Sequence, residues 1–404
     1  MAAKPIFAVG LDVGSRRTRM VICLLEAGRL RFLGASSVES RGWLKGRIAD
    51  QKAVSASIHE ALTEAELNAG VSVETVVAGM GGPTVRGANG RGVFDIGIQR
   101  EIEQRDVNVV KERASRVQLP EDRMILQMFP QDFIVDDHPG HGNPCKMVAS
   151  RLEVNVHLVT SSLQEHTFLV GAVNQAHLVV EETVFEGLGS CYSCVLPEDR
   201  REGIAVVDIG SESTELVVYY GDAMYLASTI RICGDHFTRD LAQGLCISFD
   251  DAEMVKLEYG AALSANCPEN VLVELPTPEN RERRHAPRRF INQILEARAE
   301  ELFHHVRSEL VRVGMDRALI GGVFLTGAAA RLPELCDVAE RVLVCQARYG
   351  LALGIEGWPD SMNDPEWSTV AGLAMYSAKL KEQVHHAREA AGWLGRIAGR
   401  QQWG

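Results

Sequence analysis

The sequence predicts a layered α/β protein made of two similar halves, with a smaller α+β unit inserted into the first half. Three observations carry this prediction: strand-like and helix-like runs alternate, one hairpin motif occurs twice, and the texture of the sequence changes over residues 84–162. Alternating segments of this kind are typical of layered α/β folds. A chain of 404 residues, 46% of them hydrophobic, can bury more than one core.

The first half opens with a meander of strands. Hydrophobic spacing then predicts a helix over residues 52–67, and the Gly and Pro cluster at 79–83 marks a boundary. The strands predicted from apolar runs span residues 6–11, 18–25, 29–36 and 73–80. In the inserted unit we expect a helix at 102–117, a loop rich in Pro, Gly and His at 138–144, and strands at 124–135 and 147–160.

The α/β alternation resumes after the insert. A strand at 203–208 opens a second meander, and a polar, arginine-rich loop at 276–289 leads into a long helix that ends at Val313. Two further strands are predicted at 178–185 and 322–326. The remaining helices are predicted at 163–176, 188–196, 235–246, 250–260, 331–342 and 368–380.

Composition and charge argue against several classes of protein. Acidic residues outnumber basic ones by 54 to 42, and the net charge of −12 argues against nucleic-acid binding as the main activity. The apolar stretches are shorter than the roughly 20 residues of a membrane span, and no signal sequence is evident, so we expect a cytoplasmic protein. Nine scattered cysteines favour reduced, mostly buried thiols over a disulfide framework.

The hairpin motif that occurs twice carries the first functional prediction. Residues 12–22, DVGSRRTRMVI, and residues 208–218, DIGSESTELVV, are identical at five of eleven positions. A strand, a tight D-x-G-S turn and a return strand place backbone N–H groups and a small hydroxyl where they can hold a phosphate. Asp12 and Asp208 can hold Mg²⁺ through water. A single motif of this kind is usually only a turn, but the duplicated motif predicts a clamp around a phosphorylated ligand.

Two further segments complete the predicted site. Residues 321–330, GGVFLTGAAA, form an apolar strand that ends at Thr326 and Gly327, where the backbone can approach a planar base closely. Glu253 and Lys256 stand one helical turn apart and can meet a ribose or an adenine edge. Taken alone, these two residues would be interpreted as a surface ion pair.

The two D-x-G hairpins, a linker helix between them, an AExxK segment and a strand that ends in LTG together resemble the actin-like ATPase superfamily. Within it, the chain is similar to the FtsA family of bacterial cell-division proteins over nearly its whole length. The resemblance implies an α/β, actin-like (ribonuclease H-like) two-domain ATPase fold. It also implies that the texture change falls on the family's inserted α+β subdomain, called 1C.

The resemblance divides the chain into subdomains. Subdomain 1A would comprise residues 1–84, 163–200 and 356–382, and subdomain 1C residues 85–162. Subdomain 2A would comprise residues 201–235 and 301–355, subdomain 2B residues 236–300, and an amphipathic membrane-targeting tail residues 383–404.

By the family's motifs, ATP and Mg²⁺ would bind between subdomains 1A and 2A. Asp12, Gly14 and Ser15 would form the first phosphate loop, and Asp12 and Asp208 would lie nearest the metal. The second phosphate loop and the remaining phosphate, ribose and base contacts would come from Asp208, Gly210, Ser211, Ser213, Gly234, Glu253, Lys256 and Gly327. The motifs assign no catalytic residue.

The chain departs from relatives that hydrolyse ATP readily. Those relatives carry D-x-G-G-G-T at the second hairpin, where this chain has Ser211, Glu212 and Ser213, and glycines are usual where it has Ala328 and Ala329. A carboxylate beside a triphosphate is repulsive unless it points away or reaches solvent. We therefore expect ATP binding with weak or no hydrolysis.

The C-terminal segment predicts a membrane contact. On a helical wheel, residues 384–400 gather apolar side chains, including Trp393, Leu394 and Ile397, on one side, with Arg396 and Arg400 on the other. Such a helix can lie in the headgroup layer of an anionic membrane. The alternative is a last helix that docks on the protein's own core, but the resemblance favours a membrane-targeting helix.

The loop at residues 279–289, ENRERRHAPRR, carries five arginines. Such runs are usually only solvated loops. In the family, the corresponding part of subdomain 2B binds the C-terminal peptide of the tubulin-like protein FtsZ, and Arg284 and Arg298 fall where family members use arginines near that site. An acidic or amphipathic peptide beside a basic helix is a known recognition mode.

Together these features predict a cell-division protein that binds ATP, polymerises head to tail and tethers FtsZ filaments to the membrane at the division septum. We expect it at the cytoplasmic side of the inner membrane as a peripheral protein, where it helps to recruit later division proteins through subdomain 1C. The alternatives on the same fold are a soluble actin-like ATPase, a small-molecule kinase, and a pilus-assembly or chaperone relative. A kinase needs a general base beside a substrate pocket, and no aspartate stands in a convincing position for that role.

Overall fold

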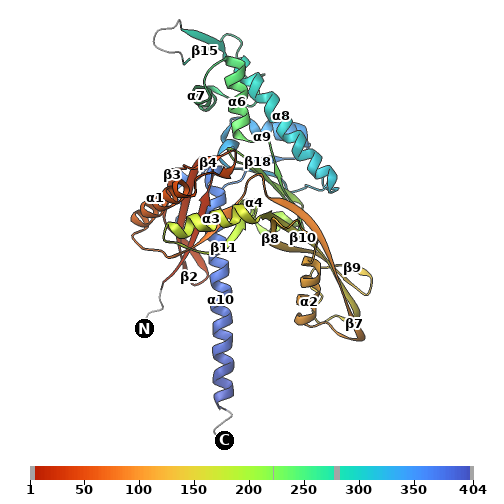
Figure 1. Cartoon of the computed structure of the whole chain (residues 1–404). Coiled ribbons are helices and arrows are strands. Elements are labelled where there is room, and N and C mark those ends of the chain that lie inside the picture. The colour runs from red at the N-terminus through yellow and green to blue at the C-terminus, as the bar shows by residue number, and fades with distance from the viewer. Residues whose placement is uncertain (1–4, 222, 277–282, 401–404) are drawn as a thin grey trace.

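The computed structural model describes residues 5–221, 223–276 and 283–400, with side chains placed as far as Val384. Two five-stranded sheets form the body of the protein, and the insert contributes a four-stranded sheet (Figure 1). The first sheet has the order β11-β6-β1-β2-β3. Its strands are β1 (Ile6–Val13), β2 (Arg17–Glu26), β3 (Arg29–Glu39), β6 (Thr75–Met80) and β11 (Val179–Phe185).

The second sheet repeats the architecture of the first. Its order is β14-β13-β12-β17-β18. In both sheets, three consecutive antiparallel strands are followed later in the chain by two strands that run parallel to the first of the three. The strands are β12 (Ile204–Ile209), β13 (Thr214–Tyr220), β14 (Ala223–Ile230), β17 (Gly322–Thr326) and β18 (Ala347–Tyr349). The register repeats as well: Asp12 pairs with Arg19 in the first hairpin, and Asp208 pairs with Glu215 in the second. The duplicated motif is therefore a duplicated hairpin within a duplicated sheet.

The first sheet, with its helices, forms the first lobe. Helices α1 (Gln51–Ala69) and α3 (Leu163–Gln175) cover one face of the sheet, and α10 (Ser368–Arg400) covers the other. Strand β1 serves both layers because alternate side chains point to opposite faces: Val9 and Leu11 pack under α1, whereas Ala8 packs under α10.

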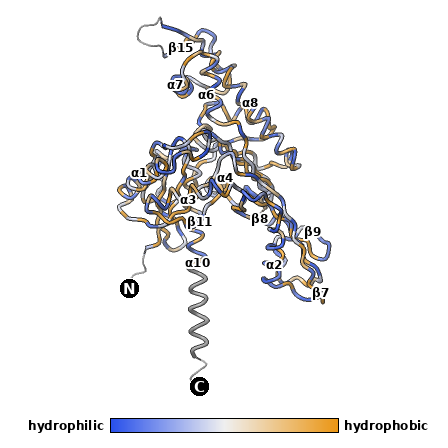
Figure 2. Tube along the Cα trace, viewed as in Figure 1, coloured by the Kyte–Doolittle hydropathy of each residue, from blue (hydrophilic) through white to orange (hydrophobic). Residues whose placement is uncertain are grey.

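The second lobe consists of the second sheet and the helices on its outer face. Figure 2 shows apolar and polar residues alternating along these outer helices, as expected of helices with one buried face. They are α6 (Gly234–Leu245), α7 (Phe249–Tyr259), α8 (Arg288–Arg312) and α9 (Leu335–Leu343), and they share one apolar core with the sheet. A two-stranded sheet, β15 (Leu272–Leu275) with β16 (Arg284–Pro287), lies beside them.

Helix α4 (Glu186–Cys194) joins the two lobes. Leu188 and Cys191 pack into a core that also holds Val77 of the first sheet, Val206 of the second sheet and Leu373 of α10. Short elements complete the chain. These are β4 (Trp43–Leu44), β5 (Arg47–Ile48), α5 (Pro197–Arg201) and the 3₁₀ turns η1 (Ala328–Arg331), η2 (Asp360–Met362) and η3 (Pro365–Trp367).

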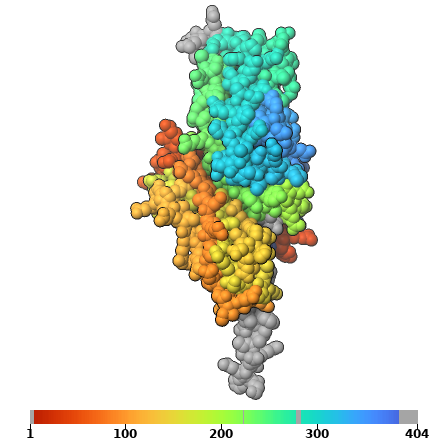
Figure 3. Space-filling view, turned by 90° about the vertical axis from the view of Figure 1, so that its right-hand side faces the viewer, coloured from red at the N-terminus to blue at the C-terminus, as the bar shows by residue number. Residues whose placement is uncertain are grey.

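The insert packs against the second lobe. Its sheet has the order β7-β10-β8-β9, with α2 on one face, and Figure 3 shows it, in orange and yellow, directly beneath the second lobe. Side chains of β10 and β8 form hydrogen bonds with strand β14: the Ala227 N–H donates to His157 Nε2 at 2.9 Å, and Gln131 donates to the Met224 carbonyl at 3.1 Å. The elements are β7 (Arg86–Glu101), α2 (Gln104–Ser115), β8 (Arg123–Val135), β9 (His138–His141) and β10 (Val148–Ser162).

The structure corrects several local predictions. The 16-residue strand β7 was not expected, because its glycines and charges lack the apolar pattern of a strand; pairing with β10 along nearly its whole length holds it. The loops predicted at 138–144 and 276–289 contain strands β9 and β16. The helix expected from residue 331 begins only at Leu335, after the turn η1.

Helix α10 does not end near residue 380 as predicted. It continues as one helix of 33 residues to Arg400 and extends beyond the body of the protein toward the C-terminus (Figure 1). Trp393, Leu394, Arg396, Ile397 and Arg400 therefore lie on this helix, but their side chains are outside the described ones. Over the ranges that the structure describes, no helix combines the length and apolar character needed to cross a membrane.

The prediction of reduced cysteines agrees with the structure. All nine are free thiols, and five of them are buried.

Candidate functional site

A cavity of about 680 Å³ lies between the two lobes. The eleven residues predicted for nucleotide binding all line it, although they come from segments far apart in the sequence. They are Asp12, Gly14 and Ser15 of the β1–β2 turn; Asp208, Gly210, Ser211 and Ser213 of the β12–β13 turn; Gly234 at the start of α6; Glu253 and Lys256 of α7; and Gly327 after β17.

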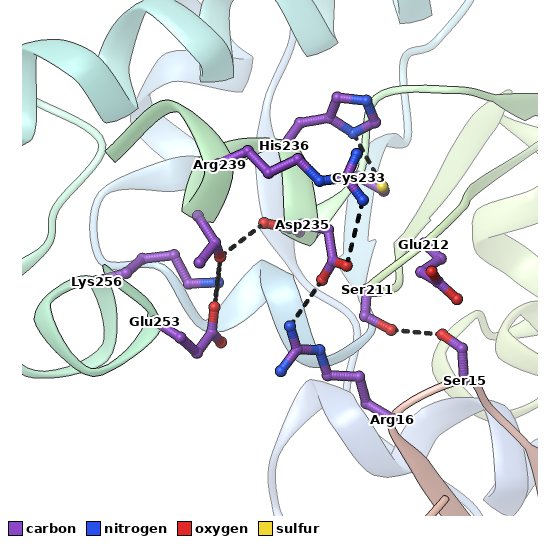
Figure 4. Close-up of polar contacts among 12 residues, drawn as sticks. Ser15, Arg16, Ser211, Glu212, Cys233, Asp235, His236, Arg239, Glu253 and Lys256 are labelled. Atoms are coloured by element: carbon purple, nitrogen blue, oxygen red, sulfur yellow. Dashed lines mark hydrogen bonds and ion pairs between the residues drawn. The ribbon is translucent and has the colours of Figure 1, made fainter. Parts of the chain in front are cut away.

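The two hairpin turns face each other across the cavity. The hydroxyl oxygens of Ser15 and Ser211 lie 2.8 Å apart (Figure 4). Both turns are tight: a Cβ atom on Gly14 would lie 2.8 Å from the Arg17 carbonyl oxygen, and one on Gly210 would lie 2.9 Å from the Ser213 carbonyl oxygen. Small residues are therefore needed at both tips, as the sequence motif suggested.

The end of β17 approaches the second hairpin closely. Gly327 has a φ of 84°, in the left-handed region, and a Cβ atom there would overlap the Asp208 carboxylate and the Ile209 carbonyl oxygen. Glycine is therefore required on two independent grounds, backbone conformation and space. Ala328 and Ala329, which follow in η1, also line the cavity.

Glu253 and Lys256 face the cavity rather than forming a simple surface pair. The Lys256 ammonium lies 2.7 Å from Glu253 and donates to the Thr238 hydroxyl at 2.9 Å, which ties α7 to α6. Burial alone would raise the pKa of Glu253, but the Lys256 charge and the hydrogen bonds lower it below its ordinary value. Glu253 therefore carries its charge at neutral pH, where Lys256 and Thr238 hold it in place.

Four carboxyl groups meet at the base of the cavity. Burial, with the neighbouring carboxylates adding to it, raises the pKa of Asp12 to about 6, that of Glu215 to about 7, and that of Glu186 well above its ordinary value. Burial also raises the pKa of Asp208, although hydrogen bonds from Ser190 and Thr369 oppose the increase. Arg19, which lies 3.8 Å from Asp12, partly offsets this effect. In all, ten carboxylates and five basic side chains line the cavity.

Sequence reasoning missed three of these deep residues. Arg19 and Glu215 occupy equivalent positions of the two hairpins, one opposite each motif aspartate, so a comparison of the two repeats beyond their identical positions would have found them. Glu186 opens α4 directly after β11 and lines the cavity. No local sequence pattern marks Glu186.

The structure also gives Glu212 a definite role. Its carboxylate accepts a hydrogen bond of 2.8 Å from the backbone N–H of Gly46, in the β4–β5 hairpin of the first lobe. The carboxylate that the sequence analysis treated as a source of repulsion is thus a contact between the lobes.

Arg284 and Arg298 lie away from the cavity. Both are attached to α6: Arg284 donates to the Leu245 and Cys246 carbonyl oxygens at the end of this helix, and Arg298 pairs with Asp240 at 2.6 Å. Arg298 also pairs with Glu301, so carboxylates of the chain itself neutralise its charge.

Comparison with known proteins agrees with the sequence resemblance. A family model described as cell division protein FtsA matches residues 205–372, and a model of the SHS2 domain inserted in FtsA matches residues 82–160. The FtsA of Borreliella burgdorferi is 32% identical, over 96% of this chain and 97% of that protein. The FtsA of Escherichia coli is 32% identical, over 91% of this chain and 89% of that protein.

Solved structures show the same fold at low sequence identity. A PilM-PilN type IV pilus biogenesis complex matches with a TM-score of 0.67 and 18% identity, over 92% of this chain and 98% of that one. MreB5 of Spiroplasma citri bound to AMPPNP matches with a TM-score of 0.56 and 11% identity, over 95% of this chain and 100% of that one. With its duplicated actin-like lobes and its inserted SHS2 domain, the chain belongs to the FtsA family of cell division proteins.

Proposed function

We propose that this member of the FtsA family binds ATP together with Mg²⁺ in the cavity between the lobes. One observation carries the proposal: the two equivalent hairpins meet at Ser15 and Ser211, and every residue predicted to contact the nucleotide lines the same cavity. Backbone N–H groups at tight, small-residue turns are suited to phosphate oxygens. The MreB5 structure with a related fold, which is described as bound to AMPPNP, supports nucleotide binding by this fold.

The charges of the cavity fit a divalent cation. The cavity holds more carboxylates than basic groups, and a triphosphate would add further negative charge. Bound Mg²⁺ would supply positive charge to the phosphates, with Asp12 and Asp208 as the residues that hold it. None of the described side chains forms a group of three or more His, Cys, Asp or Glu residues spaced to hold a metal, so we propose contact through water, as this strongly hydrated ion favours.

We propose that ATP is hydrolysed slowly or not at all. Glu212, Ala328 and Ala329 line the cavity with side chains where readily hydrolysing relatives carry glycines.

Calorimetric titration of the full chain with ATP, with and without Mg²⁺, tests nucleotide binding. We expect saturable binding that weakens when EDTA is added. Asp208 is buried and accepts hydrogen bonds from Ser190 and Thr369. The Asp208→Asn variant keeps the shape of this side chain but lacks its charge. ATP binding by this variant should lose most of its dependence on Mg²⁺. A wild-type chain that binds neither ATP nor ATP with Mg²⁺ would refute the proposal.

We further propose that the protein polymerises head to tail, tethers FtsZ filaments to the cytoplasmic membrane at the septum as a peripheral protein, and recruits later division proteins through the insert. The continuation of α10 to Arg400 supports a membrane contact, because it sets the amphipathic sequence on a single helix. Polymerisation would give many weak tails the combined affinity that one tail lacks. The subdomain limits set out above belong to the same proposal, and the SHS2 match to residues 82–160 supports the limits of 1C.

The C-terminal peptide of FtsZ is proposed to bind beside α6, β16 and α8, near Arg284 and Arg298. The support is geometric: both arginines contact α6, although they belong to different elements. Because Arg298 already has two carboxylate partners, an acidic peptide would have to compete with Asp240 and Glu301. We therefore expect salt-sensitive binding at this site.

Flotation with anionic liposomes, ATP with Mg²⁺ and labelled FtsZ tests the tether. The full chain should carry FtsZ to the lipid, and a chain that ends at Ala387 should not. An Arg284→Ala variant of the full chain should float without FtsZ, which separates the two contacts. If the full chain stays with the soluble fraction, the membrane and partner proposals both fail.

A further inference from the structure

We propose that Arg16 is a positioning residue that holds the two lobes together at the edge of the cavity, and that release of its ion pair with Asp235 limits nucleotide exchange. The exchange part rests on the proposed nucleotide binding. The closure part concerns the protein without nucleotide and stands by itself.

Arg16 belongs to the first lobe, but the polar and aromatic partners of its side chain all belong to the second lobe. Its guanidinium lies 3.1 Å from the Asp235 carboxylate of α6 (Figure 4) and 5.1 Å from the centre of the Phe249 ring, at the start of α7. Its backbone is fixed, because its carbonyl oxygen accepts the Ser40 N–H at 3.0 Å. The side chain therefore spans from an anchored turn to two helices of the other lobe.

Asp235 is held in place to receive Arg16. It lies in the first turn of α6, where a carboxylate is favoured by the helix dipole. Its backbone N–H donates to the Ser211 carbonyl at 2.8 Å, and its carboxylate lies 3.8 Å from Arg239 on the next turn. Asp235 is 91% buried, since only 9% of its surface is exposed. The Arg16–Asp235 pair thus links the first phosphate turn to the start of α6 in the second lobe, which is itself bonded to the second phosphate turn.

Several other contacts join the lobes around the same cavity. Among them are the Ser15–Ser211 hydroxyl pair at 2.8 Å, the hydrogen bond of 2.8 Å from the Gly46 N–H to Glu212 and the hydrogen bond of 3.0 Å from the Gly82 N–H to Glu215. An isolated ion pair at a surface contributes little to stability. Arg16 and these contacts, however, all oppose the same motion, the separation of the two lobes. Its side chain is 42% exposed and lines the cavity, which places it at the solvent edge, where a ligand enters and leaves.

This role and a simple attraction of an anionic ligand predict opposite effects on ATP binding when Asp235 is removed. If Arg16 only attracted phosphate, removal of Asp235 would free its charge and tighten ATP binding. If Arg16 closes the cleft through Asp235, loss of either partner opens the cleft and speeds ATP release. The Asp235→Asn variant therefore separates the two models.

The experiment compares Arg16→Ala, Asp235→Asn and Arg16→Lys with wild type. Arg116→Ala is the matched control, because it breaks an exposed pair between Arg116, just after α2 of the insert, and Glu112 within that helix, at 2.7 Å. Hydrogen exchange of the nucleotide-free chains is followed at residues 14–18 and 211–235. Release of a fluorescent ATP analogue is then followed by dilution into excess ATP.

We expect faster exchange at both segments in Arg16→Ala and Asp235→Asn, with no change in the control. Release should be about fivefold faster in both variants, the size of effect that one partly exposed ion pair allows, and Arg16→Lys should recover most of it. Unchanged hydrogen exchange, or slower release from Asp235→Asn, would overturn the inference. If wild type binds no analogue, the proposed nucleotide binding fails. Hydrogen exchange still tests whether the Arg16–Asp235 pair holds the lobes together.

Discussion

The side chains of Ser15 and Ser211 touch through hydroxyl oxygens 2.8 Å apart, although 196 positions separate them in the sequence. They occupy equivalent places in two hairpins that share the same register. The contact shows that the duplication in the sequence produces two turns that face each other. A phosphate that binds both turns would enter between these hydroxyl groups, close to the charged groups that line the cavity.

Lys256→Ala should weaken ATP binding by about tenfold, or ~1.4 kcal/mol. The substitution removes a cation from the cavity wall and leaves Glu253 without its partner at 2.7 Å, which adds a free negative charge beside an anionic ligand. Calorimetric titration measures the change. Lys379→Ala is the control, because Lys379 is exposed and donates to the Tyr192 hydroxyl away from the cavity. Equal affinities for the two variants would show that Lys256 does not contact the nucleotide.

Gly327→Ala should destabilise the protein far more than Gly70→Ala. Both glycines have a positive φ, 84° and 67°, so both substitutions pay for a left-handed backbone, at about 1 kcal/mol. A Cβ at Gly70 meets nothing within 4 Å, whereas one at Gly327 overlaps Asp208 and Ile209, and we expect a total cost of about 3 kcal/mol or more there. Urea denaturation of the two variants measures the difference, which should vanish if the end of β17 can move away from β12.

Acid should destabilise the contact between the insert and the second lobe through His157. Burial lowers the pKa of His157 to about 4, and its Nε2 must stay unprotonated to accept the Ala227 N–H. The unfolded chain binds a proton near pH 6.5, so this contribution to stability is complete above pH 6.5 and is lost as the pH falls toward 4, at most about 3 kcal/mol.

The His157→Gln variant isolates this effect. A glutamine does not titrate and can still accept a hydrogen bond, so the difference in unfolding free energy between wild type and variant should change with pH only between about 4 and 6.5. Denaturant titrations at several pH values provide the curve. If the difference in unfolding free energy does not change over this pH range, burial does not lower the pKa of His157.

Glu212→Gln should raise the affinity for ATP by about threefold at low salt, and less at high salt. It removes one negative charge from a cavity wall in which carboxylates outnumber basic groups, while an amide oxygen can still accept the Gly46 N–H. Glu60→Gln, which breaks an exposed pair with Arg41 in the first lobe, should leave affinity unchanged. A loss of affinity in Glu212→Gln would indicate that the carboxylate supports binding instead of opposing it.

Local sequence determined the elements that depend on local patterns. Hydrophobic spacing predicted a helix over residues 52–67, and α1 spans Gln51–Ala69, between a cap at Asp50 and one at Gly70. The D-x-G-S turns predicted the hairpins, and the repeat of that motif predicted two equivalent turns that face each other, because a repeated pattern of apolar and turn residues folds into a repeated unit. The site residues on the two hairpins follow from this repeat, whereas Gly234, Glu253, Lys256 and Gly327 were assigned through the family resemblance; all of them line one cavity.

Tertiary structure decided what depends on partners distant in the chain. Strand β7 has no apolar pattern of its own and forms because β10 pairs with it. Glu186 lies near Asp12 and Asp208 only through the packing of α4 between the lobes, and Arg16 contacts Asp235 only because the two lobes meet at the cavity. A single sequence records hydrophobic spacing and turn chemistry, but the charges that meet across a cleft are set by the arrangement of the elements that carry them.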